Sequence, residues 1–399
     1  MENPNASQTT IEAMTAKVRA FPCVSCGAKM AFSPGSDKQQ CPYCGAENDI
    51  ETTTDVVKEL DLEEWMAQVE KESEVHAQEQ IKCTNCNGEQ VLAANVYSTS
   101  CTFCGSPLTS KSVALRRIKP RSLVPFKVTK LKAQDAFRSW IRGLWLAPNA
   151  LKKYAQSDGG IKGVYVPYWT YDAQTSTYYT GQRGINYTEQ YRNSSGETST
   201  RTRTDWSNVS GTVQFFHDDV LVAASKTFTQ ATAPKSAETA DAMKALTASG
   251  AGKLGQMMVG RFGGGFNSWN TKELIPFQEE YIANFQTEAY QIGLKTGFGD
   301  AKRQIEVRVQ QLICEDIGGD QQRVTSSNTQ YSHLTFKHIL LPIWVSAYLF
   351  SGKTYRFLVN GQTGEVVGES PKSAWKIFFL VCAIILGVII MFGVFGGKQ

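Results

Sequence analysis

The strongest constraint on what this chain can fold into is a cysteine pattern that occurs twice. Each copy has two Cys-x-x-Cys pairs separated by fourteen residues, and the second copy begins sixty residues after the first. Eight of the ten cysteines belong to this pattern. The first copy consists of Cys23, Cys26, Cys41 and Cys44, and the second copy consists of Cys83, Cys86, Cys101 and Cys104.

Four thiols at this spacing are typical of a zinc ribbon. Zinc binds four ligands in a tetrahedron, with sulfur at about 2.3 Å, and two residues between cysteines allow one tight turn to direct both sulfurs at a single point. Gly27, Gly45 and Gly105 follow three of the turns, where a left-handed backbone is tolerated best by glycine. The sequence therefore predicts zinc ribbons at 21–46 and 81–110, each stabilised by a structural Zn²⁺ at all four cysteines.

Three other uses of the cysteines fit the sequence less well than structural zinc. A disulfide framework is disfavoured because residues 1–20, which we expect to be a flexible lead, lack the apolar core of a secretory signal. Iron in a rubredoxin-like site is disfavoured by the short spacer. A catalytic zinc is disfavoured because four protein ligands close the coordination sphere.

The C-terminal region contains a second strong signal. Residues 377–395 form a nineteen-residue run without a charged side chain, which as a helix would be about 28 Å long and close to the hydrocarbon thickness of a bilayer. A buried core helix is the alternative, but such helices seldom lack a polar face. Lys372 and Lys376 precede the run, and the positive-inside rule then keeps the bulk of the chain cytoplasmic. The sequence predicts a single-pass, tail-anchored protein of the cell (plasma or inner) membrane.

The two linkers carry opposite charge. The segment 47–80 contains twelve acidic residues and two lysines and is predicted to be an acidic helical linker with a solvated face, a partner-binding helix being the alternative. The segment 111–132 contains eight Lys or Arg residues and no acid. Three binding modes remain open for this basic linker: pairing with the acidic linker, contact with anionic lipid headgroups, and contact with nucleic-acid phosphates.

Residues 120–370 are predicted to form an α+β body rich in β-strands. Aromatic and β-branched residues predict strands at 163–184 and 199–225, and hairpins at 334–369. A long helix is expected at 285–314, broken near Gly297. "LVPF" followed by "VPYW" resembles "LIPF" followed by "LPIW", which suggests a duplicated unit. The predicted fold class is thus α+β, with two small zinc ribbons, this body and one C-terminal transmembrane helix.

No motif in the sequence predicts catalysis. "SGKT" at 351–354 lacks the first glycine of a phosphate-binding loop, and the four histidines are scattered. "HDD" at 217–219 is interpreted as a surface turn rather than a cation site. We therefore predict that the chain is not an enzyme, with a membrane-attached enzyme of unknown chemistry as a hypothesis that motifs alone do not exclude.

The combination of the tandem ribbons with "GVYVPYWTYD", "LLPIWVSAY" and "VNGQTGEVVGESP" resembles a known family. The chain is similar to bacterial membrane proteins with a TFIIB-type zinc finger, often labelled primosomal protein N′ or superfamily II helicase relatives. The helicase label would imply ATP binding, which the missing phosphate loop argues against. The resemblance implies association with phage-shock-protein-A-like and SPFH proteins.

Together these observations predict a membrane-tethered, cytoplasmic zinc-ribbon adaptor that binds and recruits protein partners. The alternative is a nucleic-acid-binding zinc-ribbon protein connected with replication or transcription. The ribbons themselves carry few positive charges, so nucleic-acid binding would depend on the basic linker. Arg116, Arg117, Lys119 and Arg121 are its candidate phosphate contacts.

Overall fold

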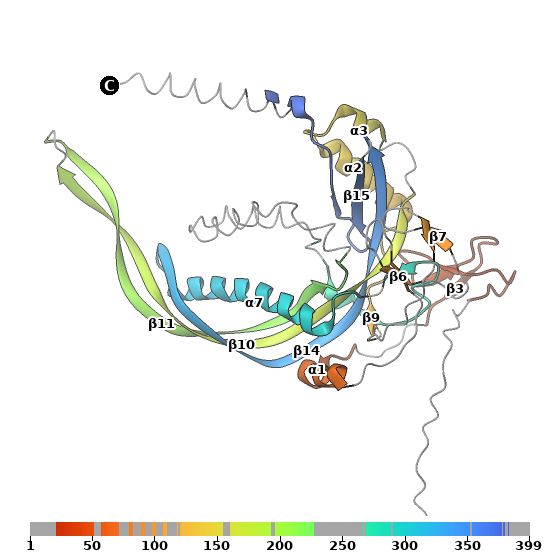
Figure 1. Ribbon diagram of the computed structural model, residues 1–399, viewed down its shortest axis with the longest axis horizontal. Coiled ribbons are helices and arrows are strands. Elements are labelled where there is room, and N and C mark those ends of the chain that lie inside the picture. Colours follow the sequence, from red (N-terminus) through yellow and green to blue (C-terminus); the bar gives the residue numbers. More distant parts are fainter. Residues whose placement is uncertain are drawn as a thin grey trace, which may run out of the picture.

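A nine-stranded sheet dominates the described part of the computed structural model (Figure 1). Its central path runs in the order β11-β10-β14-β15-β16. The structure describes residues 21–51, 57–71, 80–82, 89–91, 98–100, 107–109, 118, 120–154, 160–192, 196–226, 266, 269–288, 290–351, 353–376, 378–379 and 382.

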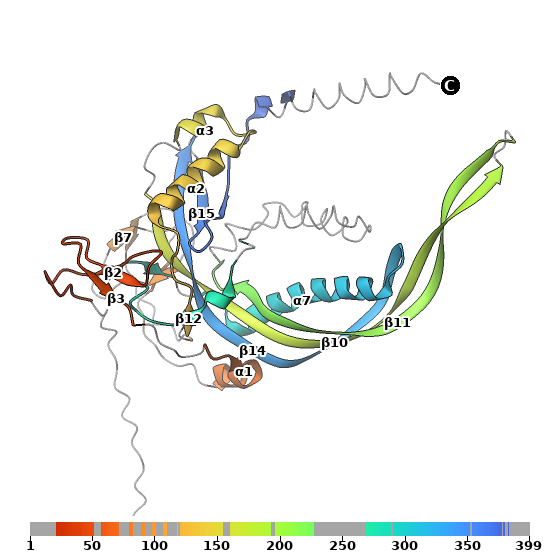
Figure 2. The ribbon, with the colours of Figure 1, turned by 180° about the vertical axis from the view of Figure 1, so that it is seen from behind.

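Three very long strands form the curved part of the sheet, as Figures 1 and 2 show from opposite sides. They are β10 (Lys162–Arg192), β11 (Thr198–Ala223) and β14 (Gln321–Phe350), of 31, 26 and 30 residues. β10 lies in the middle and pairs antiparallel with both neighbours. Aromatic and β-branched residues, which favour extended backbone, are abundant in the inner part of these strands and are buried there.

Shorter strands complete the sheet. The sheet ends at β15 (Lys353–Asn360) and β16 (Val366–Gly368), and a turn containing Gly364 at φ +81° joins these two strands. The strands off the central path are β4 (Leu60–Asp61), β9 (Ser122–Leu123), β12 (Ile275–Pro276) and β13 (Gln286–Thr287).

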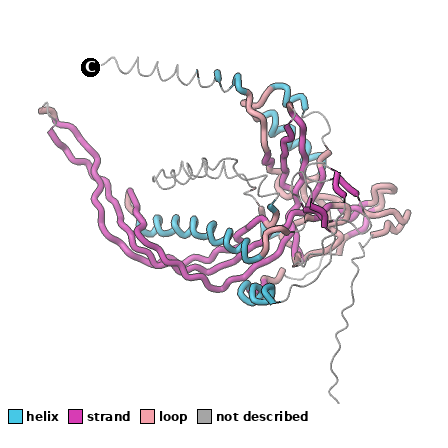
Figure 3. Tube along the Cα trace, viewed as in Figure 1, coloured by secondary structure: helices cyan, strands magenta, loops and turns pink. Residues whose placement is uncertain are grey.

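The helix α7 (Leu294–Ile317) lies along the concave face of the sheet (Figure 3). Its buried residues recur every three or four positions, as expected for one face of a helix. They are Leu294, Gly297, Phe298, Ala301, Ile305, Val309, Ile313 and Ile317. The predicted break near Gly297 is wrong, because the Gly297 N–H donates to the Gly293 carbonyl (2.9 Å) inside a continuous helix.

The remaining helices are short and lie at the periphery. α1 (Leu62–Lys71), from the acidic linker, packs its buried Leu62 into the cluster that contains Trp169 and Phe336. The others are α2 (Lys130–Gly143), α3 (Asn149–Tyr154) and the 3₁₀ turn η1 (Thr271–Glu273). Residues 374–376, 378–379 and 382 are also helical.

The echo noted in the sequence has a structural counterpart. The "LVPF" strand β9 pairs with the "LIPF" strand β12 through Leu123 and Ile275. The "VPYW" and "LPIW" segments are neighbours in β10 and β14, where Val166 pairs with Leu341. The similar segments therefore adjoin each other in the same sheet.

The predicted α+β fold class is wrong for the body of the protein. The described body is a largely antiparallel β structure organised by three strands of exceptional length, rather than the predicted β-rich α+β unit. Local sequence signals predicted the strands at 163–184 and 199–225 but not that each strand runs without interruption. Uninterrupted length is set by cross-strand pairing between distant segments, which local patterns do not reveal.

The predicted transmembrane helix at 377–395 is also corrected. Among the described residues, no helix is long and apolar enough to cross a membrane. The predicted single-pass, tail-anchored location depended on that helix and is withdrawn with it. Of this run the structure describes Phe378, Phe379 and Cys382, and its other residues lie outside the described part. An uncharged run shows that a segment avoids water, but it does not by itself specify a spanning helix.

Candidate metal centre

The first predicted ribbon forms a small three-stranded antiparallel sheet that carries two Cys-x-x-Cys turns. Its strands are β1 (Ala31–Phe32), β2 (Lys38–Gln40) and β3 (Glu47–Asp49), in the order β1-β2-β3. One Cys-x-x-Cys turn precedes β1, and the other lies between β2 and β3. The fourteen-residue spacer therefore provides the out-and-back strands that bring the two turns together.

The first turn is closed by backbone hydrogen bonds. The Gly27 N–H donates to the Cys23 carbonyl (2.8 Å), and the Cys23 N–H donates to the Ala28 carbonyl (2.7 Å). Gly27 has φ +71°, and a Cβ built on it would meet no atom within 4 Å. Glycine is thus favoured at this position by its left-handed backbone conformation rather than by lack of space.

The second turn repeats this geometry. The Gly45 N–H donates to the Cys41 carbonyl (3.0 Å), and the Cys41 N–H donates to the Ala46 carbonyl (2.8 Å). Gly45 has φ +75°, again with no atom within 4 Å of an added Cβ. The two turns are therefore equivalent, and each directs a buried and an exposed cysteine toward the same point.

The four sulfur atoms form one compact group. Cys23 Sγ lies 3.5 Å from Cys44 Sγ, and Cys26 Sγ lies 3.6 Å from Cys41 Sγ. All four ligand atoms lie within 4.8 Å of one another. Sulfurs at about 2.3 Å from a tetrahedral ion are separated by about 3.8 Å. These four cysteines therefore have the geometry to hold a metal ion.

Backbone amides act on the buried sulfur of each turn. Hydrogen bonds from the N–H groups of Cys44 and Tyr43 lower the pKa of Cys41 to about 6. The amides of Cys26 and Ser25 lower the pKa of Cys23 in the same way. These amides stabilise negative charge on the two sulfurs independently of a bound cation.

The exposed thiols behave in the opposite way. The Ala28 amide lowers the pKa of Cys26, but the neighbouring thiols outweigh it and raise the value to about 12. The pKa of Cys44 is likewise raised, because neighbouring thiols outweigh the Ala46 amide. Four thiolates this close together repel one another, and a bound cation would remove that penalty.

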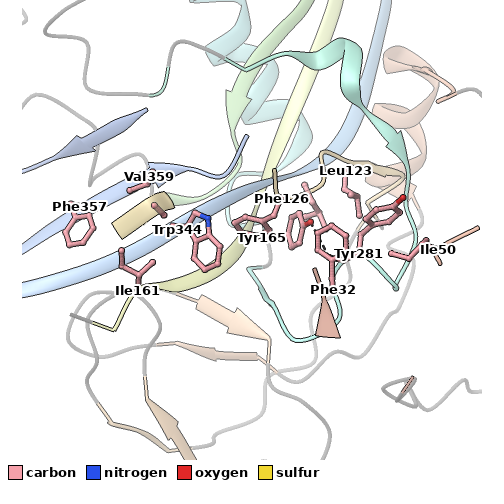
Figure 4. Close-up of a cluster of buried hydrophobic side chains, with 12 residues drawn as sticks. Phe32, Ile50, Leu123, Phe126, Ile161, Tyr165, Tyr281, Trp344, Phe357 and Val359 are labelled. Carbon is pink, nitrogen blue, oxygen red and sulfur yellow. Dashed lines mark hydrogen bonds between the residues drawn. The ribbon is translucent and has the colours of Figure 1, made fainter. Parts of the chain in front are cut away.

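The ribbon is not an independent module, because its strands pack into the core of the body. The Phe32 ring lies against Tyr281 (centroids 5.1 Å apart) in the cluster shown in Figure 4. It also lies against Phe285 (centroids 6.3 Å apart), which packs against this cluster. Ile50 is buried in the same cluster. The metal centre is thereby attached to the sheet through one face of its own ribbon.

Hydrogen bonds fix this docking. The Phe32 N–H donates to the Ala283 carbonyl (3.2 Å), and the Gly35 N–H donates to the Phe126 carbonyl (2.8 Å). The Gln39 side-chain amide, 4% exposed, donates to the Glu280 carbonyl (3.2 Å). Because these contacts include three backbone carbonyls of the body, the orientation of the ribbon is fixed as well as its position.

The second predicted ribbon is described only in its strands. β5 (Gln80–Lys82) pairs with β6 (Glu89–Val91), and β7 (Ser98–Ser100) pairs with β8 (Pro107–Thr109). The predicted ligands Cys83, Cys86, Cys101 and Cys104 lie outside the described residues. The second metal site therefore stays a prediction.

A group of charged residues that sequence analysis did not identify lies inside the sheet. The Lys337 ammonium is 2.8 Å from Asp219, 2.9 Å from Glu59 and 3.5 Å from Asp172. Asp172 also accepts the Asp219 N–H (2.6 Å) at a bulge in β10. The "HDD" segment thus lies in strand β11 rather than in a surface turn, and its Asp219 belongs to the ion-pair network.

This network places one ammonium among three carboxylates. Burial lowers the pKa of Lys337, but hydrogen bonds to Asp219 and Glu59 outweigh it and raise the pKa above its ordinary value. Asp172, Asp218 and Asp219 are close enough to hold a cation, and the Lys337 ammonium already pairs with two of these carboxylates, Asp172 and Asp219. No sequence motif connects Lys337 with Asp172, because their proximity arises only from β10–β14 pairing.

Comparison with known proteins gives limited similarity. No protein-family model matches the chain, and no solved structure matches it. The chain is 24% identical over 363 residues to an uncharacterized protein of Bacillus subtilis (strain 168), YdjG, with the similarity covering 90% of this chain and 92% of the relative. The similarity therefore extends along nearly the whole of both chains, well beyond the cysteine turns.

Proposed function

We propose that this chain is a non-catalytic adaptor, in which a metal-bound ribbon fixed to a large sheet provides a binding surface for protein partners. The observation that carries the proposal is the composition of the metal centre. All four ligand positions belong to cysteines of the chain, so a tetrahedral ion bound there has no open position for water or substrate. The role of such an ion is structural.

The metal that fits best is Zn²⁺, with one ion at Cys23, Cys26, Cys41 and Cys44. Sulfur donors in a tetrahedron suit zinc and also iron, and only iron gives strong visible absorption. A second Zn²⁺ at Cys83, Cys86, Cys101 and Cys104 completes the proposal. Two zinc ions per purified chain, measured by mass spectrometry of the metal content, are expected. Iron absorption would contradict the assignment to zinc.

The proposed partner-binding surface lies at the metal end of the ribbon, away from the docked strands. Val24 and Tyr43 are large apolar side chains that are 83% and 82% exposed. Val24 follows Cys23 and Tyr43 precedes Cys44, and these two cysteines have sulfur atoms 3.5 Å apart. Exposed apolar side chains at one rigid site are a common feature of protein interfaces.

The partner class comes from the family resemblance, which implies phage-shock-protein-A-like and SPFH proteins. The test measures binding of the full-length chain to one purified protein of each class from the same organism. We expect the double variant V24S/Y43S to weaken binding at least tenfold without loss of zinc. A matched control is V307S/Y178S, since Val307 and Tyr178 are 61% and 55% exposed elsewhere on the body.

Two outcomes would contradict the proposal. If the chain bound neither purified protein, the proposed partner classes would be wrong. Equal weakening by both double variants would show that the ribbon tip has no special part in binding.

A further inference from the structure

The outer edge of the sheet is unusually long. β11 is the terminal strand of the sheet, with 26 residues, and among the described residues it pairs with β10 alone. The opposite terminal strand, β16, has three residues. Soluble proteins usually keep sheet edges short or interrupt them with proline, lysine or a bulge. Residues 198–210 of β11 contain no proline or lysine and pair with β10 without a register shift.

The outermost part of this edge is a two-stranded arm. Pairing of β10 with β14 ends at Gly184 opposite Gln321, whereas pairing of β10 with β11 continues to Arg192 opposite Thr198. The arm is visible in Figures 1 and 2 as the hairpin that extends beyond β14. Isolated two-stranded hairpins are marginally stable in water, so an additional strand would stabilise this one.

The direction of the backbone groups identifies which residues face the free edge. The Asn186 N–H donates to Asp320 Oδ2 (2.7 Å) and therefore points away from β11, toward the β14 side. Thr204 lies directly opposite Asn186. In an antiparallel pair both residues then point their backbone groups outward. The N–H and C=O groups of Thr204, and of alternate residues such as Thr200 and Thr202, face the free edge of β11.

The charges along this edge are self-complementary. Arg201 and Arg203 each lie within 2.8 Å of Glu189 on the neighbouring strand. Asp205, on the same face, is exposed and has no ion pair among the described residues. A strand that pairs with this edge needs a cation opposite Asp205 and an anion near Arg203. The same stretch of a second chain provides both.

We propose that the chain forms a two-fold dimer through antiparallel pairing of β11 with β11 of a second copy, centred on Thr204. In this register Arg203 of each copy lies opposite Asp205 of the other, and the contact occurs twice by symmetry. Pairing centred on Thr202 would place Arg201 opposite Arg203, and pairing centred on Arg203 would place that residue opposite itself. Like charges directly opposite each other are destabilising, so the charges select the Thr204 register.

The geometry of the arm permits this pairing. The paired segments would be residues 198–210 of each copy, and the two bodies would extend in opposite directions from the shared arms. Thr202 would lie opposite Trp206, a β-branched and aromatic pair of the kind that stabilises sheets. The other edge of the arm is less suitable, because Asp320 already binds the Asn186 N–H at its base.

The first test compares two proline variants of the full-length chain. Thr202 and Thr188 are directly opposite each other in the arm, and their N–H groups face opposite edges. Thr202→Pro removes a donor from the proposed interface, and Thr188→Pro makes the same change on the other edge. Sedimentation velocity is expected to show a dimer for the wild type and T188P, and a dissociation constant at least tenfold higher for T202P.

The second test fixes the register. Thr204 lies on the proposed two-fold axis, where paired residues have Cα atoms about 5.5 Å apart, within disulfide range. Thr204→Cys is therefore expected to form an oxidised dimer above the wild-type background. Thr202→Cys is not, because its two copies would be about 13 Å apart along the strands.

Each outcome decides the proposal. A wild type that remains monomeric at tens of micromolar, or that dimerises equally with T202P, would overturn it. Cross-linking of T202C but not T204C would overturn the register. Occupation of this edge by a different protein in a monomeric chain would also contradict it.

Discussion

Gly297 lies where α7 packs closely against the sheet. A Cβ built on Gly297 would be 2.5 Å from Tyr171 Oη and 2.9 Å from Trp169 Cδ1. Both rings are fully buried, and Tyr171 Oη donates to the Leu294 carbonyl (2.8 Å) in the first turn of α7. Neither ring can move without losing contacts in the core. We expect Gly297→Ala to destabilise the protein.

The magnitude follows from two opposing effects. Alanine is favoured over glycine inside a helix by about 1 kcal/mol. Overpacking a rigid core costs about 1–3 kcal/mol, and weakening the buried Tyr171 hydrogen bond costs a further 1–3 kcal/mol, roughly. Together these predict a net loss of about 1–5 kcal/mol in the free energy of unfolding.

Gly299, two residues further along α7, provides the matched control. A Cβ added there meets no atom within 4 Å, so Gly299→Ala should gain about 0.5–1 kcal/mol from helix propensity alone. Urea unfolding followed by tryptophan fluorescence, at fixed zinc concentration, measures both variants. The midpoint is expected to fall for G297A and rise for G299A. A G297A protein as stable as the wild type would refute the steric argument, and a G299A protein destabilised to the same extent would show that the helix simply requires glycine.

Four further predictions concern charge, metal binding and nucleic-acid binding. Lys337→Met should cost about 3–5 kcal/mol in thermal or urea unfolding, because Asp172, Asp219 and Glu59 would lose their cation; an unchanged midpoint would contradict this. Since the pKa of Lys337 is raised above 10.5, its charge stabilises the fold below that pH, and the wild type should lose its advantage over K337M as pH rises through the folded-state value. A chelator should expose Phe32 and its neighbours at the docked face, measured as faster amide hydrogen exchange at 278–285, and protection that persists in a metal-free protein would contradict a structural ion. For the nucleic-acid alternative, neutralising the four basic residues named above should abolish any salt-dependent gel shift with DNA or RNA, and absence of a shift in the wild type would remove that alternative.

The first metal centre shows how much a local pattern can specify. The backbone of each four-residue turn already places two sulfurs, because its hydrogen bonds connect residues no more than five apart. The fourteen-residue spacer is long enough only for a short hairpin. The grouping of Cys23, Cys26, Cys41 and Cys44 was therefore predictable from sequence. The C-terminal run shows the limit of such patterns, because hydropathy predicted a spanning helix that the described residues do not contain.

The tertiary structure decided where the ribbon docks and how the sheet is built. Phe32 meets Tyr281 and Phe285, about 250 positions away in the chain, and Lys337 meets Glu59 across a comparable distance. The cysteine turns were determined by the sequence itself because metal ligation depends on short-range backbone geometry. The docked ribbon, the buried ion pairs and the length of β10, β11 and β14 depend on which distant segments pair, and that choice is made by the packing of the whole core.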